Sequence, residues 1–368
     1  LSTLWLRDTC TCPLCVDPDS GQKNFATTEI SSRPPYSRAE VAEDGSLVIE
    51  WENDFMSGGP HTSRWTPEEV NSWFRSPSPR ISWHVPRTLW NKAKYESLRD
   101  QCQISYDDWL HNDDAFAAVF EKLFETGLVF VKDVPTTETE VEKVANRIGI
   151  LQQTFYGATW DVRSKPHAEN VAYTSKFLGL HQDLMYHKPI PKLQFLHCLE
   201  NSCEGGESLF SDGLRAAYDL KLNQPAIYAQ LCDLPVHFHY KKGGHDYEWR
   251  HSTIREVQGW VQSTHWAPPF QAPFSPQHNL RGVQTPLPAG SVLQWHRAAK
   301  AFQENIEAPE NVVEVKLRPG ECVIFDNTRL LHGRRQFTAS QGHRWLKGTY
   351  ISPQVFRGAE NRLAEKMK

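Results

Sequence analysis

The residues Gly179-Leu180-His181-Gln182-Asp183 place a histidine and an aspartate two positions apart. Side chains two positions apart on an extended strand point to the same face of a sheet. An imidazole and a carboxylate can therefore converge on one metal ion at this point. A single His-x-Asp is weak evidence by itself, because the pattern arises by chance in a chain with 16 His and 44 acidic residues.

A second histidine, His332, lies far downstream near the end of a strand-like run at residues 323–333, VIFDNTRLLHG. Alone, it would be interpreted as a structural histidine. Arg344 follows twelve residues later. Two imidazoles and one carboxylate leave three coordination positions open, which suits non-haem Fe(II) with a bidentate co-substrate and O2. Arg344 can then bind the far carboxylate of that co-substrate in a bidentate fork.

The composition places this motif in a well-packed chain. The length of 368 residues is sufficient for two domains of ordinary size. The apolar fraction of 39% excludes wholesale disorder. The net charge of −4 argues against a general binder of nucleic acids or membrane surfaces. No run approaches the ~18 apolar residues that span a bilayer. We expect a cytoplasmic protein, or a mitochondrial one if a transit peptide preceded Leu1.

Local patterns predict a mixed α+β chain. Helix caps and apolar spacing predict one helix between Asn112 and Gly127 and a second from a capping box at Thr137 to Gly149, with a strand at 128–131 between them. A further helical stretch is expected near residues 291–307. Short strand-like runs broken by Gly and Pro prevail from about residue 170 onward, which favours a β-sandwich or barrel core.

The first ~90 residues differ from the rest, and the Pro- and Arg-rich stretch from Pro77 to Pro86 is a plausible hinge. Three cysteines, Cys10, Cys12 and Cys15, fall within six residues of one another there. In a long chain without a secretion signal, such a cluster indicates a metal site rather than a disulfide framework. Three thiolates need a fourth ligand to complete a tetrahedron.

Longer segments resemble a known family. The opening WLRDTCTCPLC at residues 5–15 is similar to that of the gamma-butyrobetaine and trimethyllysine dioxygenases, which are Fe(II)- and 2-oxoglutarate-dependent oxygenases. The resemblance continues in order over nearly the whole chain, at residues 154–160, 170–174, 205–208 and 325–335. Residues 155–157 and 170–173 look more like the butyrobetaine enzyme, and residues 87–91 look more like the trimethyllysine one.

The resemblance implies a zinc-binding domain at residues 1–95 and a double-stranded β-helix (jelly-roll) oxygenase domain at residues 96–368. It places iron at His181, Asp183 and His332. It places the 2-oxoglutarate carboxylate at Arg344, with Ser208 and Leu196 in the same pocket. The structural zinc would take Cys10, Cys12, Cys15 and His61, with His84 as the competing fourth ligand.

Substrates of this family carry a trimethylammonium group, which donates no hydrogen bonds and is recognised by aromatic faces. The family's cage positions are all aromatic here: Tyr156, Trp160, Tyr173 and Tyr350. The resemblance also implies that Asn170 binds the substrate. Packing in a folded core is the competing interpretation, because strand interiors favour Tyr and Trp in any case.

Two departures bear on the substrate. The butyrobetaine enzyme uses an Asn for the substrate carboxylate near a segment that reads QSTHWAPP here, at residues 262–269, so His265 or Trp266 stands in its place. Thr328 replaces a Trp usual before the distal His motif.

The expected function is hydroxylation of an unactivated C–H bond in a small trimethylammonium or amino-acid substrate, most simply gamma-butyrobetaine in carnitine biosynthesis. Trimethyllysine, or another amino acid in secondary metabolism, is the alternative. A binding protein with an inactive metal site and a Jumonji-type oxygenase acting on methyl-lysine are rivals, disfavoured by the intact motif and by the net charge of −4. Small-molecule substrate and O2 are the expected partners, and a homodimer is the expected assembly.

Overall fold

The chain divides into two compact units, Leu1–Ile81 and Ser82–Lys368. The computed structural model describes residues 1–74, 86–163, 175–274, 277–278, 284–285, 287, 289–338, 340 and 342–366. The sequence-based boundary at 95/96 differs from this division, because Trp90 and Tyr95 are fully buried in the core of the second unit. Residues 86–95 therefore pack with the larger unit.

The first unit is a small three-stranded antiparallel sheet, in the order β1-β2-β3, with short helices around it. Ile49, Trp51 and Trp65 form one small core, and a second one surrounds Cys10 and Cys15. Its elements are α1 (Thr3–Asp8), the 3-10 helix η1 (Thr27–Glu29), β1 (Tyr36–Val41), β2 (Leu47–Trp51), β3 (His61–Trp65) and α2 (Pro67–Phe74).

The second unit contains a six-stranded sheet, β4-β5-β17-β8-β19-β6, and a four-stranded sheet, β16-β9-β18-β7. Its first part comprises α3 (Lys92–Leu98), η2 (Arg99–Cys102), β4 (Gln103–Ser105), α4 (Tyr106–His111), α5 (Asp113–Thr126), β5 (Leu128–Lys132), α6 (Glu140–Asn146), β6 (Thr159–Arg163), β7 (Leu178–His181), β8 (Leu193–Asn201) and β9 (Ser208–Asp212). Its last part comprises β16 (Val312–Val315), β17 (Cys322–Asp326), β18 (Leu330–Arg334), β19 (Arg344–Ile351) and α10 (Pro353–Lys366).

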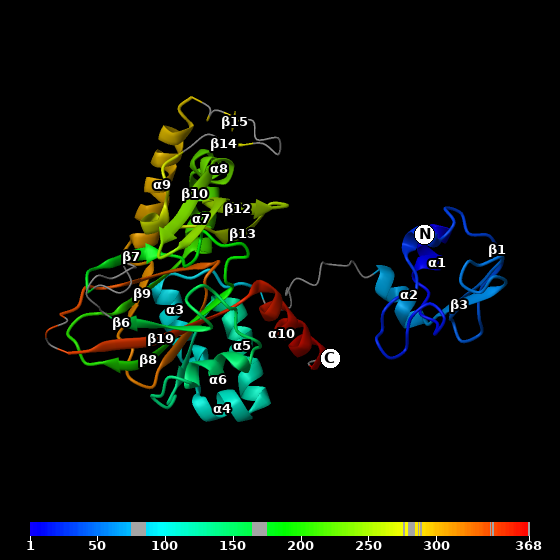
Figure 1. The fold of residues 1–368 in the computed structure, drawn as a ribbon, viewed down its shortest axis with the longest axis horizontal. Helices are drawn as coiled ribbons and strands as arrows, with labels where there is room; N and C mark the ends of the chain where they lie inside the picture. Colours follow the sequence, from blue (N-terminus) through cyan, green and yellow to red (C-terminus); the bar gives the residue numbers. More distant parts are fainter. Residues whose placement is uncertain are drawn as a thin grey trace. The chain divides into compact units, whose positions relative to one another are not determined.

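The strands of the two sheets alternate along the chain. From β7 to β9, and again from β16 to β19, consecutive strands belong alternately to the four-stranded and the six-stranded sheet. This winding is that of a double-stranded β-helix, and the expected fold class is confirmed. In Figure 1, helices α4, α5 and α6 gather at one end of this unit and α7, α8 and α9 at the other.

A long excursion separates β9 from β16. It contains α7 (Gly213–Asn223), α8 (Pro225–Asp233), β10 (Pro235–Lys242), β11 (His245–Ser252), β12 (Ile254–Val257), β13 (Trp260–Thr264), η4 (Pro268–Phe270), β14 (Gln277–His278), β15 (Gln284–Thr285) and α9 (Ser291–Glu307). The excursion begins and ends at neighbouring strands, since Ser211 of β9 pairs with Val312 of β16.

The predicted helices are present, but α6 spans Glu140–Asn146 and so begins later and ends earlier than predicted. Helix α5 spans Asp113–Thr126, where the Asn112 side chain accepts from the backbone N–H of Ala115 and Gly127 ends the helix at φ 77°. The predicted capping box at Thr137 is wrong, because α6 begins only at Glu140. Its N-cap residue is Thr139, whose side chain makes no capping hydrogen bond. Helix α9 has the expected bounds. Within the described residues, no helix is long and apolar enough to cross a membrane.

Candidate active site

The two histidines of the predicted metal site face each other across neighbouring strands. His181 ends β7, and its register partner on β18 is His332, with the ring centroids 4.3 Å apart. Asp183 follows β7 by two residues. Its Oδ1 lies 3.3 Å from His181 Nε2 and 3.9 Å from His332 Nε2. The structure thus brings together all three residues that the sequence motif proposed.

The loop that carries Asp183 is fixed by the side chain of Asn327. The Asn327 Oδ1 accepts from the backbone N–H of Asp183 at 2.8 Å, and its Nδ2 donates to the Asp183 carbonyl at 3.0 Å. The side chain of Gln182 reaches the other way: it donates to the Asn327 carbonyl at 2.8 Å and accepts from the backbone N–H of Trp266 at 3.0 Å. Both amides are fully buried, so the loop is held without help from solvent.

The protonation states of His332 and Asp183 suit a divalent metal. Burial lowers the pKa of His332 to about 3, so its imidazole is neutral at pH 7. Burial would raise the pKa of Asp183, but the hydrogen bond from His181 and the nearby His332 and Tyr350 hold it well below its usual range. His181 Nδ1 lies 2.9 Å from the Gly179 carbonyl, which directs Nε2 toward Asp183. Two imidazole nitrogens and one carboxylate oxygen fit non-haem Fe(II).

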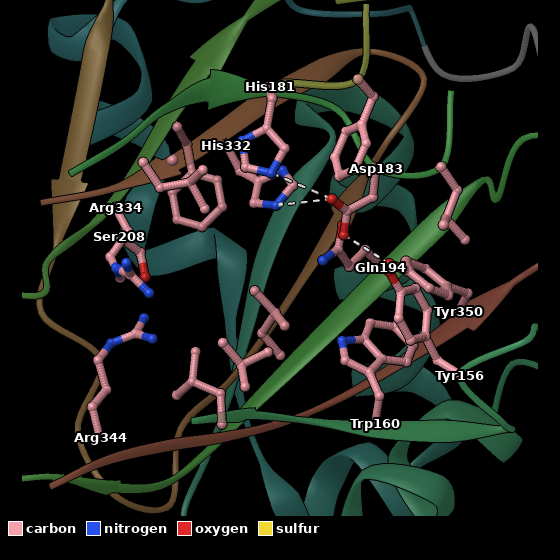
Figure 2. Close-up of a pocket in the computed structure, with 18 of the residues that line it drawn as sticks. Tyr156, Trp160, His181, Asp183, Gln194, Ser208, His332, Arg334, Arg344 and Tyr350 are labelled. Atoms are coloured by element: carbon pink, nitrogen blue, oxygen red, sulfur yellow. Dashed lines mark hydrogen bonds and ion pairs between the residues drawn. The ribbon is translucent and has the colours of Figure 1, made fainter. Parts of the chain in front are cut away.

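One end of the adjoining pocket is cationic. Arg344 on β19, Ser208 on β9 and Leu196 on β8 all line it, as Figure 2 shows for the two polar residues. Arg344 is only 7% exposed, and its buried Nε has no partner among the described residues. Burial lowers the pKa of Arg344 to about 10, which still leaves the guanidinium charged at pH 7. Such a group fits a carboxylate that enters the pocket.

The other end of the pocket is aromatic. Tyr156, Trp160 and Tyr350 line it, and the rings of Trp160 and Tyr350 stack with centroids 3.9 Å apart (Figure 2). The Tyr350 hydroxyl donates to Asp183 Oδ2 at 2.7 Å. Burial raises the pKa of Tyr350 well above its ordinary value, so the hydroxyl keeps its proton. Asn170 and Tyr173, also expected here, lie outside the described residues.

The first unit holds a separate cluster of potential ligands. His61 Nε2 lies 3.4 Å from Cys10 Sγ, 3.7 Å from Cys12 Sγ and 3.5 Å from Cys15 Sγ. Three sulfurs and one imidazole nitrogen match the ligand set of a closed tetrahedral zinc site. Cys15 also accepts from the Arg7 guanidinium at 3.3 Å. The alternative ligand, His84, lies outside the described residues.

Comparison with known proteins decides the family. Residues 92–350 match the family described as taurine catabolism dioxygenase TauD, TfdA family. The chain belongs to this family. Dioxygenase str8 of Strobilurus tenacellus is 35% identical, covering 94% of this chain and 81% of that protein. The gamma-butyrobetaine dioxygenase of Pseudomonas sp. (strain AK-1) is 29% identical, covering 95% and 86%.

Other similarities agree with this assignment. The mitochondrial trimethyllysine dioxygenase of Rattus norvegicus is 26% identical, covering 95% of this chain and 79% of that protein. Asparagine oxygenase, solved with Fe(II), 2S,3S-3-hydroxyasparagine and succinate, shares the fold at a TM-score of 0.51 and 16% identity, covering 70% and 83%. The expected resemblance is therefore confirmed, and this TauD/TfdA member is an Fe(II)/2-oxoglutarate-dependent dioxygenase.

Several residues of the TauD/TfdA pocket were not foreseen from the sequence. They are Arg334, two residues after His332, together with Tyr186, Gln194 and Phe270. Gln194 is 2% exposed, and its Oε1 has no partner among the described residues. Its place in the pocket follows from sheet register, because it pairs with Tyr350 on one side and Phe325 on the other. No local sequence pattern carries that information.

The sequence suggested that His265 or Trp266 replaces the Asn that binds the substrate carboxylate, but the position of these residues relative to the pocket does not support this. Neither lines it within the part of the chain described here. His265 is buried with Nδ1 2.7 Å from the Ser252 carbonyl and Nε2 3.1 Å from Ser263 Oγ. Both ring nitrogens are thus engaged by the protein, and the imidazole acts as a structural link.

Proposed function

We propose that this dioxygenase hydroxylates an unactivated C–H bond of a small trimethylammonium compound of the gamma-butyrobetaine type. The observation that carries the proposal is the position of the aromatic residues Tyr156, Trp160 and Tyr350 beside Asp183, at the end of the pocket away from Arg344. A quaternary ammonium that lies on these faces gains cation–π attraction of ~0.5–2 kcal/mol per ring when desolvated. The gamma-butyrobetaine dioxygenase relative supports the same substrate class.

In this proposal each end of the pocket has its own task. His181, Asp183 and His332 hold Fe(II), which together with 2-oxoglutarate and O2 supplies the oxidising power and yields succinate and CO2. Arg344 and Ser208 would bind the far carboxylate of 2-oxoglutarate in the pocket that Leu196 also lines. The aromatic residues would orient the substrate for attack at one C–H bond and keep water out. No side-chain general base is needed.

Trimethyllysine or another amino acid is the alternative substrate. The feature that favours it is the absence of an Asn from residues 262–269, where the butyrobetaine enzyme binds the substrate carboxylate. Two arginines, Arg334 and Arg344, are among the described residues that line the pocket, and either could bind a carboxylate. A substrate whose acid group is held differently would therefore suit this pocket. With gamma-butyrobetaine as substrate, the role would be carnitine biosynthesis.

The decisive experiment measures succinate release from 2-oxoglutarate with gamma-butyrobetaine, trimethyllysine and smaller amino acids. We expect release with a trimethylammonium substrate and weaker binding of its neutral tert-butyl analogue. Trp160→Leu should raise the apparent KM for the charged substrate about tenfold, since ~1.4 kcal/mol is tenfold. Equal binding of the charged and neutral compounds would show that these rings are core packing and that the substrate is not a betaine.

The matched control is Trp260→Leu, the same replacement at a residue that is 57% exposed on β13 and does not line the pocket. It should leave the apparent KM within twofold of wild type. Turnover of 2-oxoglutarate without substrate should change little in Trp160→Leu, because Arg344 and the metal residues are untouched. His181→Ala should abolish Fe(II)-dependent turnover, and near wild-type activity in that variant would contradict the metal assignment.

A further inference from the structure

The two oxygens of the Asp183 carboxylate have different surroundings. Oδ1 faces both imidazoles, 3.3 Å from His181 Nε2 and 3.9 Å from His332 Nε2. Oδ2 points away from the histidines and accepts the hydrogen bond of the Tyr350 hydroxyl at 2.7 Å (Figure 2). One oxygen is thus available where a metal would be held by the histidines, and the other is occupied by a protein donor.

This division matters because a carboxylate can bind a metal ion through one or two oxygens. Two-oxygen binding would use a coordination position that the co-substrate or O2 needs at a site with three protein ligands. A hydrogen bond to the second oxygen makes that mode unfavourable, since the bond would have to break. Partners of this kind orient metal ligands and typically contribute 10–100-fold to metal affinity.

The Tyr350 hydroxyl is well placed for such a task. Tyr350 lies near the end of β19, where its register partner on β8 is Gln194. Its ring stacks on Trp160 with a centroid distance of 3.9 Å, and its side chain is fully buried. The hydroxyl is therefore held in position before any metal or substrate arrives, which is the condition for preorganising a ligand.

We propose that Tyr350 is a positioning residue for the metal site: its hydroxyl holds Asp183 Oδ2, so that Oδ1 alone faces the metal. This role differs from the substrate contact of the Tyr350 ring, and it rests on the proposed function of His181, Asp183 and His332 as metal residues. The two roles of Tyr350 are separable by chemistry. Tyr350→Phe removes the hydroxyl and keeps the aromatic face.

The first test uses wild-type protein freed of iron and titrated with Mn(II), a probe that prefers oxygen and nitrogen over the thiolates of the first unit. Water proton relaxation counts the water molecules on the bound ion. A six-coordinate ion with one oxygen from Asp183 keeps about three waters. About two waters in wild type would mean that both oxygens bind, and the inference would be overturned whether or not any variant folds.

The second test compares Mn(II) affinity between wild type and Tyr350→Phe by electron paramagnetic resonance of the free ion. We expect the Kd to rise about tenfold in the variant. The matched control is Tyr95→Phe, which removes another buried hydroxyl, one that donates to the Leu128 carbonyl at 3.2 Å outside the pocket. Its Kd should stay within twofold of wild type.

A Tyr350→Phe Kd within twofold of wild type would overturn the inference, and so would an equal loss in Tyr95→Phe, since the effect would then be general destabilisation. Failure of the metal assignment of His181, Asp183 and His332, on which the inference rests, gives a different result. In that case wild-type protein would not bind Mn(II) at the site at all, and His181→Ala would not change the titration.

Discussion

Asn327 shows how a single amide can replace a stretch of strand. Its side chain bonds both the N–H and the C=O of Asp183, as a neighbouring strand would, and also donates to the Pro191 carbonyl at 3.2 Å. Leu184, next in the chain, has a positive φ of 57°, so the backbone that follows β7 is irregular here. The metal residue is thus placed on irregular backbone without leaving that backbone unsatisfied.

Replacing Asn327 with Ala should be costly for stability. Two partly buried backbone groups at Asp183 and the buried Pro191 carbonyl lose their partner, and a buried group left unsatisfied costs ~1–3 kcal/mol. Urea unfolding followed by circular dichroism should show a loss in that range or above. Asn311→Ala is the control, because the Asn311 side chain donates to Asn305 in a partly buried turn and its loss should cost less. Equal losses in the two variants would contradict the role given to Asn327.

At the scale of elements, the contact between β6 and β19 shapes the aromatic end of the pocket. Trp160 on β6 is the register partner of Gly348 on β19, and its ring covers the place where a Gly348 side chain would be. A Cβ there would lie 2.5 Å from Trp160 Cε2. The absence of a side chain at residue 348 therefore allows Trp160 to stack on Tyr350.

Gly348→Ala should displace the Trp160 ring. We expect a loss of ~1–3 kcal/mol in the free energy of unfolding, which is typical of overpacking, and a change in the near-ultraviolet circular dichroism of the stacked rings. Gly59→Ala offers the control, because a Cβ at Gly59 would meet nothing within 4 Å and its φ is not in the left-handed region. An unchanged unfolding free energy in Gly348→Ala would show that the ring has room to move.

Helix α10 carries a carboxyl group whose charge is unfavourable in the folded state. Burial raises the pKa of Glu360 to about 7, against the opposing charges of Arg357, Lys192 and Arg87. The buried Oε1 has no partner among the described residues. Because the folded pKa lies above the ordinary value of ~4.3, the folded state favours the protonated form. The stability that this form provides is complete below about pH 4 and is lost as the pH rises toward 7.

Glu360→Gln imitates the protonated form at every pH. Its Tm should equal that of wild type near pH 4.5 and exceed it increasingly up to pH 7, with a constant gap above. Differential scanning calorimetry across this range measures the gap. Glu310→Gln, at an exposed residue, should show no such dependence. A gap that is the same at pH 4.5 and pH 8 would exclude a buried charge as the cause.

The elements also show what a sequence can predict. Helix α5 was predicted with its bounds because its signals are local: Asn112 and Gly127 bond within one turn of the helix. The metal triad was predicted because His181 and Asp183 lie two residues apart at one strand end and His332 follows a strand-like apolar segment. Gln194 and the Tyr350 hydroxyl bond were not, because both depend on which strands pair and in which register. That pairing is set by the whole core.

At the scale of the molecule, the two units reach stability by different routes. The large unit buries an extensive apolar core. The small unit has two minor clusters, one of which includes Cys10 and Cys15 themselves. A domain with so little core depends on a staple such as a bound metal. We propose that zinc, held by Cys10, Cys12, Cys15 and His61, fulfils this role.

Cys12→Ser should therefore lower the zinc content from about one ion per chain towards zero and lower the Tm of the small unit. Fe(II)-dependent turnover at permissive temperature should persist, because the proposed active site lies entirely within the large unit. Elemental analysis and calorimetry measure both effects. Cys232→Ser, at a partly exposed cysteine of α8 outside the cluster, should leave the zinc content unchanged. Zinc absent from wild type would refute the assignment.

The pairing of Ser211 with Val312 has a consequence for how this scaffold can diversify. The described strands between β9 and β16 pair outside the two main sheets, while His181, His332 and Arg344 lie outside this insert. The insert still contributes Phe270 to the pocket lining and anchors Gln182 through the backbone of Trp266. Evolution, or an engineer grafting this insert from another relative, can thus replace the surface that Phe270 presents to the substrate while Tyr156, Trp160 and Tyr350 stay unchanged, provided that the contact between residue 266 and Gln182 is kept.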